Sequence, residues 1–130
     1  MTEARVLALD YGSARCGCAV SDPTLTLATP IEAVELPRSR RGLARLRALV
    51  AELGVGSVVV GLPLSLSGGE SAQTVEAREF AAELSRVLGV PVELYDERFT
   101  TAIAARGGGA GSEDSRAAAV LLEGWLAARG

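Results

Sequence analysis

The sequence contains no histidine and no lysine, so that all 13 of its basic residues are arginine. The absence of histidine excludes histidine-based catalytic triads, imidazole proton shuttles and the zinc sites that use histidine. The absence of lysine excludes Schiff-base catalysis and the lysine of a phosphate-binding P-loop. Any hydrolytic chemistry in this chain therefore has to come from carboxylates and from a metal ion that they bind.

Cysteine is scarce, and long apolar runs are absent. Cys16 and Cys18 lie two positions apart on an expected strand, so their side chains share a face and an unstrained disulfide between them is not expected. No stretch approaches the roughly 18 apolar residues of a membrane helix, and the N-terminus lacks the basic and apolar regions of a signal peptide. We expect a reduced, cytoplasmic protein that makes no membrane contact.

Length and composition predict one compact domain that covers residues 1–130, with 48% hydrophobic residues to form its core. The net charge of −3 argues against a general nucleic-acid binder, which normally carries a basic surface. A local basic patch could override this total. The region with this character begins an expected helix and contains Arg38, Arg40, Arg41, Arg45 and Arg47.

These arginines have two interpretations, a solvated helix face or a contact patch for nucleic acid. Positive charge at the start of a helix opposes the helix dipole, so stability does not explain where they lie. The sequence leaves both interpretations open.

Hydrophobic periodicity predicts the order of the secondary-structure elements. Strands are expected over 5–10, 15–21, 25–36 (broken by Pro30), 57–62 and 92–95, and helices over 39–53, 71–88, a short stretch from Phe99, and 112–128. Three antiparallel strands followed by strands with helical crossovers predict an α/β protein. Its expected fold is ribonuclease H-like, with a five-stranded mixed β-sheet flanked by α-helices.

Acidic residues lie where three of these elements end or begin. Asp10 ends the first strand, Asp96 and Glu97 follow the last strand, and Asp114 begins the final helix. Each has a simple structural explanation as a strand end, a polar turn or a helix-dipole partner. The helical spacing of Asp114 with the apolar residues that follow it predicts that it points toward the sheet and away from water. Carboxylates gathered on one core in this way are typical of a divalent metal site.

Four segments resemble the successive motifs of one family, in the same order along the chain. They are LDYGSAR with AVSD (9–15 and 19–22), VVGLPL (59–64), DERFTT (96–101) and DSRAAAVLL (114–122). These segments are similar to the motifs of the YqgF family, bacterial RuvC-like proteins described as Holliday junction resolvases and as pre-16S ribosomal RNA nucleases. The resemblance covers nearly the whole chain and implies a cytoplasmic phosphodiesterase with a ribonuclease H-like fold.

The resemblance also implies catalytic and metal-binding roles for Asp10, Glu97 and Asp114. Asp96 is a weaker candidate, because a neighbour on an extended segment points the opposite way. Residues that could approach or hold flanking phosphates are Gly12, Ser13, Arg15, Arg98, Thr100 and Thr101. Two departures from the family pattern are the short, glycine-rich stretch before Asp114 and the two cysteines, which stand where aliphatic residues are usual.

The expected mechanism uses two Mg²⁺ or Mn²⁺ ions about 4 Å apart, one to activate a water and one to stabilise the leaving 3′ oxygen. The expected partner is nucleic acid, with processing of the 5′ end of pre-16S rRNA favoured and branched DNA at a Holliday junction as the alternative. A homodimer would favour junctions, which need two symmetric cuts, and a monomer would favour RNA.

Two other classes of function stay open. One is a catalytically inactive nucleic-acid-binding module with the same fold. The other is an actin-like ATPase, whose first phosphate motif resembles residues 10–13, although such enzymes need a second domain to clamp the nucleotide.

Overall fold

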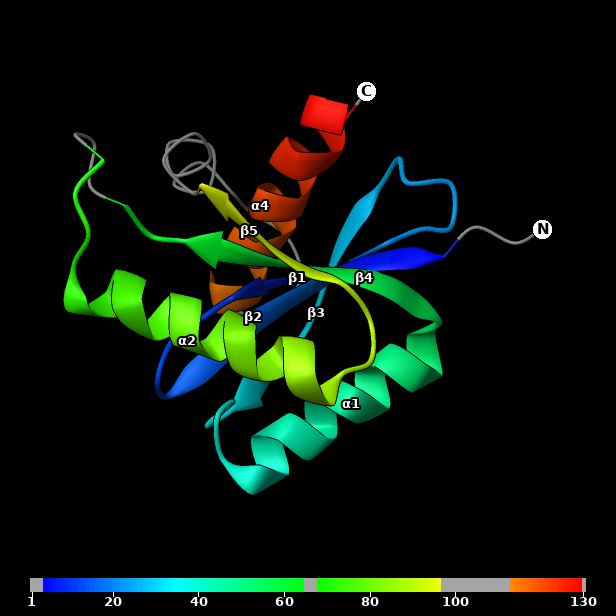
Figure 1. The fold of residues 1–130 in the computed structure, drawn as a ribbon. Helices are drawn as coiled ribbons and strands as arrows, with labels where there is room; N and C mark the ends of the chain where they lie inside the picture. The colour runs from blue at the N-terminus through cyan, green and yellow to red at the C-terminus, as the bar shows by residue number, and fades with distance from the viewer. Residues whose placement is uncertain (1–3, 65–67, 97–112, 130) are drawn as a thin grey trace.

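The computed structural model of the chain describes residues 4–64, 68–96 and 113–129. Within these ranges five strands and three helices follow one another along the chain (Figure 1). They are β1 (Arg5–Asp10), β2 (Arg15–Ser21), β3 (Ala28–Glu35), α1 (Arg40–Leu53), β4 (Val55–Leu62), α2 (Ala72–Val87), β5 (Val92–Asp96) and α4 (Glu113–Arg129).

The strands form one mixed sheet with the order β3-β2-β1-β4-β5. The pairs β1–β2 and β2–β3 are antiparallel, whereas β1–β4 and β4–β5 are parallel. The predicted five-stranded mixed sheet is thus confirmed. Because β1, β4 and β5 run the same way, they all end at one edge, which we call the carboxyl edge of the sheet; it carries Asp10, Leu62 and Asp96.

Helices cover both faces of the sheet: α1 and α2 pack on one face and α4 on the other (Figure 1). Successive side chains of a strand point to opposite faces. Along β1, Leu7 and Leu9 enter the core under α1 and α2, while Val6 and Ala8 pack with α4. The same alternation places Asp10 on the face that α4 covers.

The helix ends follow from capping residues that the sequence shows. The Ser39 hydroxyl accepts a hydrogen bond from the Gly42 amide at 3.0 Å, and α1 stops at Gly54, which has a left-handed φ of 66°. At the start of α2, Ser71 and Thr74 form a capping box, with each side chain bonded to the other's backbone amide. Both helices lie within about a residue of the predicted ranges.

The third strand differs from its prediction. It starts at Ala28 and continues through Pro30, which was expected to break it. A proline lacks a donor for the sheet ladder, but β3 is an edge strand, where that donor is dispensable. The short helix expected from Phe99, the glycine-rich stretch and the cap at Ser112 lie outside the described residues.

Across the parts of the chain that the structure describes, no helix combines the length and the apolar character needed to cross a lipid bilayer.

Candidate active site

Asp10 ends the central strand β1 at the carboxyl edge and is partly buried. In the antiparallel ladder its partner on β2 is Gly17. Because Asp10 lies on the α4 face, its carboxylate and the first turn of α4 are on the same side of the sheet. Gly17, the ladder partner of Asp10, shows where the first turn of α4 lies relative to this carboxylate.

Asp114 reaches this point from the last helix. A Cβ atom added to Gly17 would lie 1.9 Å from the carbonyl oxygen of Asp114, so strand and helix backbones are packed directly against each other. Only glycine permits this approach. Asp10 thus lies beside Gly17 in the sheet, and Asp114 lies over it.

The charges of both carboxylates reach the buried Cys16 thiol. Its pKa is raised well above the usual range, first by the hydrogen bond with Cys18, then by burial and the charge of Cys18. The negative charges of Asp10 and Asp114 both add to this rise. The two acids, from opposite ends of the chain, therefore act on the same buried group.

Ser115 fixes the first turn of α4 on β2. Its hydroxyl oxygen accepts a hydrogen bond from the Cys18 amide at 3.2 Å, and the residue is fully buried. The inward position at the start of the helix is thus occupied by Ser115, from which the buried stripe continues through Ala118, Leu122 and Trp125.

The predicted inward orientation of Asp114 is wrong, because Ser115 occupies the inward position in the first turn of α4. Its side chain is 42% exposed and pairs with Arg15, with Arg15 Nε 3.3 Å from Asp114 Oδ2. The helical spacing predicted that Asp114 would face the sheet, but the helix is rotated by one residue, so that Ser115 faces the sheet instead. The carboxylate lies at the rim of the site, where solvent and ligands have access.

Arg15 brings a positive charge to the two acids. It begins β2, shares the α4 face with Gly17, and its side chain is 58% exposed. In the ladder with β3 it lies opposite Glu35. An ion pair this exposed contributes about 0–1 kcal/mol to stability, so the guanidinium remains available to a ligand.

The turn between β1 and β2 contains the next two candidates. A Cβ on Gly12 would lie 2.6 Å from the carbonyl oxygen of Arg15, so the close approach of the backbone explains why glycine is present at this position. Ser13 is exposed in the same turn. Their predicted contact with phosphate stays a prediction.

Asp96 ends β5 at the carboxyl edge. The preceding residue, Tyr95, packs with the α4 cluster, so alternation directs Asp96 to the opposite face from Asp10. Among the described residues no group of three potential metal ligands comes together. The third predicted ligand, Glu97, lies outside those residues, as do Arg98, Thr100 and Thr101.

Sequence reasoning missed three residues that hold the site. Gly17 and Ser115 were not singled out, although a glycine inside a strand often marks a close backbone approach. Tyr11 was also missed: its ring lies 4.8 Å from that of Phe80, and its hydroxyl donates to Glu76 of α2 at 3.3 Å. Burial and then Glu76 raise the Tyr11 pKa, which keeps the phenol protonated as the donor. These contacts hold the residue after Asp10 against the α2 side.

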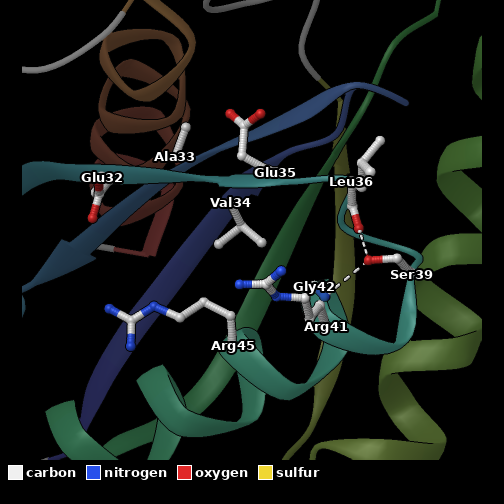
Figure 2. A pocket seen from close by; sticks show the side chains of 9 residues that line it. All are labelled: Glu32, Ala33, Val34, Glu35, Leu36, Ser39, Arg41, Gly42 and Arg45. Carbon is white, nitrogen blue, oxygen red and sulfur yellow. Dashed lines mark hydrogen bonds between the residues drawn. The ribbon is translucent and has the colours of Figure 1, made fainter.

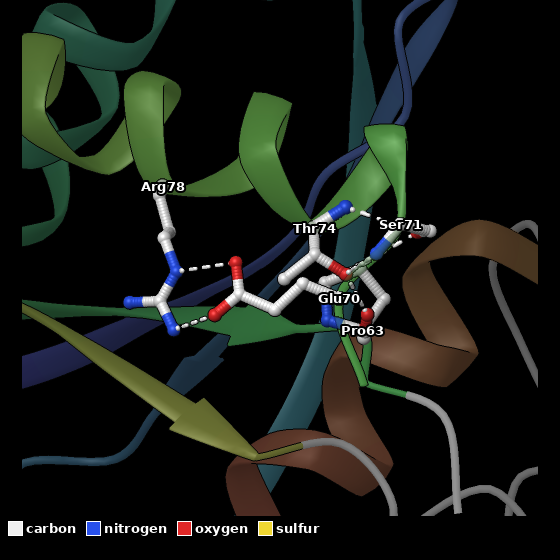
Figure 3. Close-up of polar contacts among 5 residues, drawn as sticks. All are labelled: Pro63, Glu70, Ser71, Thr74 and Arg78. Atoms are coloured by element: carbon white, nitrogen blue, oxygen red, sulfur yellow. Dashed lines mark hydrogen bonds and ion pairs between the residues drawn. The ribbon is translucent and has the colours of Figure 1, made fainter. Parts of the chain in front are cut away.

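The chain after β4 is fastened at the same edge (Figure 3). The Thr74 hydroxyl donates to the Pro63 carbonyl, which ties the first turn of α2 to the end of β4. Glu70 receives two hydrogen bonds from Arg78, from Nε at 3.3 Å and from Nη2 at 2.6 Å. These contacts hold the start of α2 in place beside the carboxyl edge.

Comparison with known proteins points to one family. The family model described as "RuvX: Holliday junction resolvase" matches residues 4–128. A relative from Anaeromyxobacter sp. strain Fw109-5, provisionally named a pre-16S rRNA nuclease, is 44% identical over 134 residues, which cover 96% of this chain and 98% of the relative. A protein of Streptomyces avermitilis with the same provisional name is 49% identical over 111 residues, covering 82% and 69%.

Solved structures support the fold. RuvC of Thermus thermophilus, in complex with a Holliday junction substrate, matches with a TM-score of 0.61 at 20% identity and covers 98% of this chain and 96% of its own. A yeast mitochondrial Holliday junction resolvase matches with a TM-score of 0.53 at 12% identity, covering 96% and 78%. At such identities the likeness concerns the fold alone, and the predicted ribonuclease H-like architecture is confirmed.

Proposed function

The chain belongs to the RuvX (YqgF) family, and from this membership we propose that it is a metal-dependent nuclease that processes the 5′ end of pre-16S rRNA. The observation that carries the proposal is the meeting of Asp10 and Asp114 at Gly17. Two acids from distant parts of the chain lie close together there, and like charges that are close repel each other. A divalent cation bound between them would offset this repulsion more fully than the exposed pair with Arg15 does.

The donor chemistry of this position fits a hard divalent ion such as Mg²⁺ or Mn²⁺, which prefers carboxylate oxygens. Asp10 and Asp114 are the two described ligands in the proposal, and Glu97 is the third, taken from the sequence motif. The soft donors Cys16 and Cys18 are buried in the core on the other face of the sheet. When bound, the metal would supply a water of lowered pKa as nucleophile and neutralise charge on the leaving oxygen.

Arg15 has a second role in this proposal. Without a metal it neutralises Asp114, and with a metal in place its exposed guanidinium is free to bind a substrate phosphate. Gly12 and Ser13 lie in the turn just before it and could approach the same phosphate. Arg98, Thr100 and Thr101 complete the proposed substrate contacts from the sequence motif.

The first experiment compares labelled single-stranded RNA, single-stranded DNA and a four-way junction, each incubated with the native protein in Mn²⁺, in Mg²⁺ or in EDTA. Asp10→Asn should lower the cleavage rate by at least a hundredfold, because the ligand charge is lost while the side-chain volume is kept. The control is Asp96→Asn, whose carboxylate lies on the opposite face and whose loss should leave most activity.

Equal cleavage by the native protein and the Asp10→Asn variant would contradict the metal site. If the native protein bound one of these nucleic acids but cleaved none of them in Mn²⁺ or Mg²⁺, the result would support a catalytically inactive binding module instead.

Junction cleavage is the second candidate, favoured because the matching family is described as a Holliday junction resolvase. It requires two symmetric cuts and hence two sites in one assembly. Two results together would favour this function over rRNA processing. The protein would cleave the junction and leave RNA intact, and sedimentation would show that it is a dimer.

A further inference from the structure

The surface of α1 carries an unusual concentration of positive charge. In a chain with a net charge of −3, positions 36–51 hold five arginines and no acid. Arg38 is engaged with α2, through Glu79 at 3.4 Å and Glu83 at 3.2 Å. The others lie on the exposed side of α1 and are named here the α1 arginine surface: Arg40, Arg41, Arg45 and Arg47.

This surface has no evident role in stability. The first turn of α1 contains no acidic residue, so positive side chains meet the positive end of the helix dipole. Arg45 pairs with Glu52 at 3.6 Å, but both side chains are about half exposed or more. Such a pair adds little to stability. Stability therefore does not explain the placement, and these exposed side chains are open to an external anion.

A groove of about 470 Å³ lies between β3 and the beginning of α1 (Figure 2). The side chains of Arg41 and Arg45 extend along it beneath the strand. Glu35 also borders the groove, but its carboxylate points away from these arginines, to the other side of β3. Glu32, at the end of the groove away from Leu36, points its carboxylate to the same side of β3 as the arginines. The part of the groove beside Leu36 and Arg41 is thus basic.

Leu36 closes the other end of the groove and is presented to solvent. Its side chain is 58% exposed, and its φ of 43° lies in the left-handed region that a leucine rarely adopts. The conformation is held by hydrogen bonds: the Leu36 amide donates to Ala14 at 2.9 Å, and its carbonyl accepts from Ser39 Oγ at 2.7 Å. A strained backbone that exposes an apolar side chain beside guanidinium groups is typical of a ligand-binding position.

The groove also begins next to the candidate active site. Ala14, which bonds to Leu36, lies in the turn that follows Asp10, and Arg15 faces Glu35 across the β2–β3 ladder. A polymer bound at Arg15 and Asp114 can therefore continue over this turn to Leu36 and then to Arg41.

We propose that the groove between β3 and α1 binds the single-stranded part of the substrate that flanks the cleaved bond. Arg41 and Arg45 contact successive phosphates, since their Cβ atoms, one turn apart, are separated by about 5–6 Å, similar to the spacing of phosphates along a strand. Leu36 packs against an unstacked base, which a duplex does not offer. This inference rests on the proposed nuclease function and extends it to the substrate.

The test measures binding separately from cleavage, in the Asp10→Asn background with EDTA. Fluorescence anisotropy follows a labelled RNA single strand long enough to reach the groove, at several salt concentrations. Arg41→Gln with Arg45→Gln should weaken binding and reduce the slope of log affinity against log salt by about 0.7 for each lost phosphate contact. Leu36→Gly suits the backbone and should weaken binding with the slope unchanged, because it removes an apolar contact.

The matched control is Arg86→Gln, an exposed arginine near the end of α2, at the opposite edge of the sheet. It should leave both affinity and slope unaltered. The melting curve of the double arginine variant should match or exceed that of the native protein, since Arg41 lies in the first turn of α1, where a positive charge opposes the helix dipole. Leu36→Gly should not lower it either, because glycine suits the left-handed φ. Loss of binding then cannot be attributed to unfolding.

Unchanged affinity and slope in the double arginine variant would overturn the inference, and so would an equal arginine dependence with duplex RNA. Cleavage distinguishes it from the proposed function. The double variant should cleave a short oligonucleotide, confined to the active site, as fast as native protein and a long strand more slowly. Absence of cleavage by native protein would reject the nuclease and leave the binding test valid.

Discussion

The ion pair between Arg15 and Asp114 is the residue-scale feature with the clearest chemical consequence. Both side chains are well exposed, at 58% and 42%, so solvent screens the pair and it adds little to stability. What it does affect is the charge that a cation or a phosphate meets at this point. In the proposed function, this one guanidinium would compete with the metal for Asp114 and would attract the substrate phosphate.

Arg15→Gln should therefore change two affinities in opposite directions. Loss of the competing cation should raise the affinity for Mn²⁺ by about fivefold, which corresponds to about 1 kcal/mol for a solvated pair of charges. Loss of the phosphate partner should weaken RNA binding and lower its salt slope by about 0.7. Calorimetric titration of Mn²⁺ and anisotropy of RNA give the two values.

Arg86→Gln again serves as the control, because it removes the same charge far from the carboxyl edge. A lower affinity for Mn²⁺ in the Arg15 variant would contradict a competing role. It would place Arg15 among the groups that support the metal site.

At the scale of elements, the docking of α4 on β2 decides where Asp114 lies. The contact has two parts, the direct backbone approach at Gly17 and the hydrogen bond from Cys18 to Ser115. The first requires that no side chain intervenes, and the second holds the helix once it has docked. The two parts can be removed one at a time.

Gly17→Ala should displace the first turn of α4, because the new methyl group would overlap the Asp114 carbonyl. We expect a loss of about 1–3 kcal/mol in the free energy of unfolding, as for other overpacked sites, together with a large fall in the cleavage rate. Denaturant unfolding and single-turnover cleavage measure the two effects.

Ser115→Ala is the comparison, since it leaves the Cys18 amide unsatisfied without a clash. A similar loss of about 1–3 kcal/mol is expected there, with a much smaller effect on cleavage. Equal losses of activity in the two variants would show that stability, and not the position of Asp114, explains the Gly17 result.

For the whole molecule, the candidate site joins the first strand to the last helix. A cation held by Asp10 and Asp114 would bind the folded chain and not the unfolded one, because only folding brings the two acids to Gly17. Ligands of this kind stabilise a protein by mass action.

Mn²⁺ should therefore raise the melting temperature, by an amount that corresponds to about 2.7 kcal/mol at a hundredfold excess over its dissociation constant. Differential scanning fluorimetry measures the shift, and EDTA should reverse it. Asp10→Asn and Asp114→Asn should each abolish most of the shift, whereas Asp96→Asn should retain it. The same shift in all three variants would place the ion elsewhere.

The sequence alone determined most of the elements and the ends of two helices. Those features depend on neighbouring residues: periodicity sets a helix or a strand, and Ser39, Ser71 and Gly54 act through groups within a few positions of themselves. The position of Asp10 at a strand end followed in the same way. The proposed roles of Glu97, Arg98, Thr100 and Thr101 still derive from the sequence motif.

The way in which the elements pack against one another depends on contacts between residues that are distant in the sequence. Helical spacing gave the residues that share a stripe with Asp114, but the rotation of α4 on the sheet was set by Gly17 and Ser115, which are far apart in the sequence. The exposure of Asp114, its pairing with Arg15 and the position of the α1 arginines beside the carboxyl edge follow from such long-range contacts. A local pattern carries no information about which distant backbone will lie against it, and that is why these features appeared only in the folded molecule.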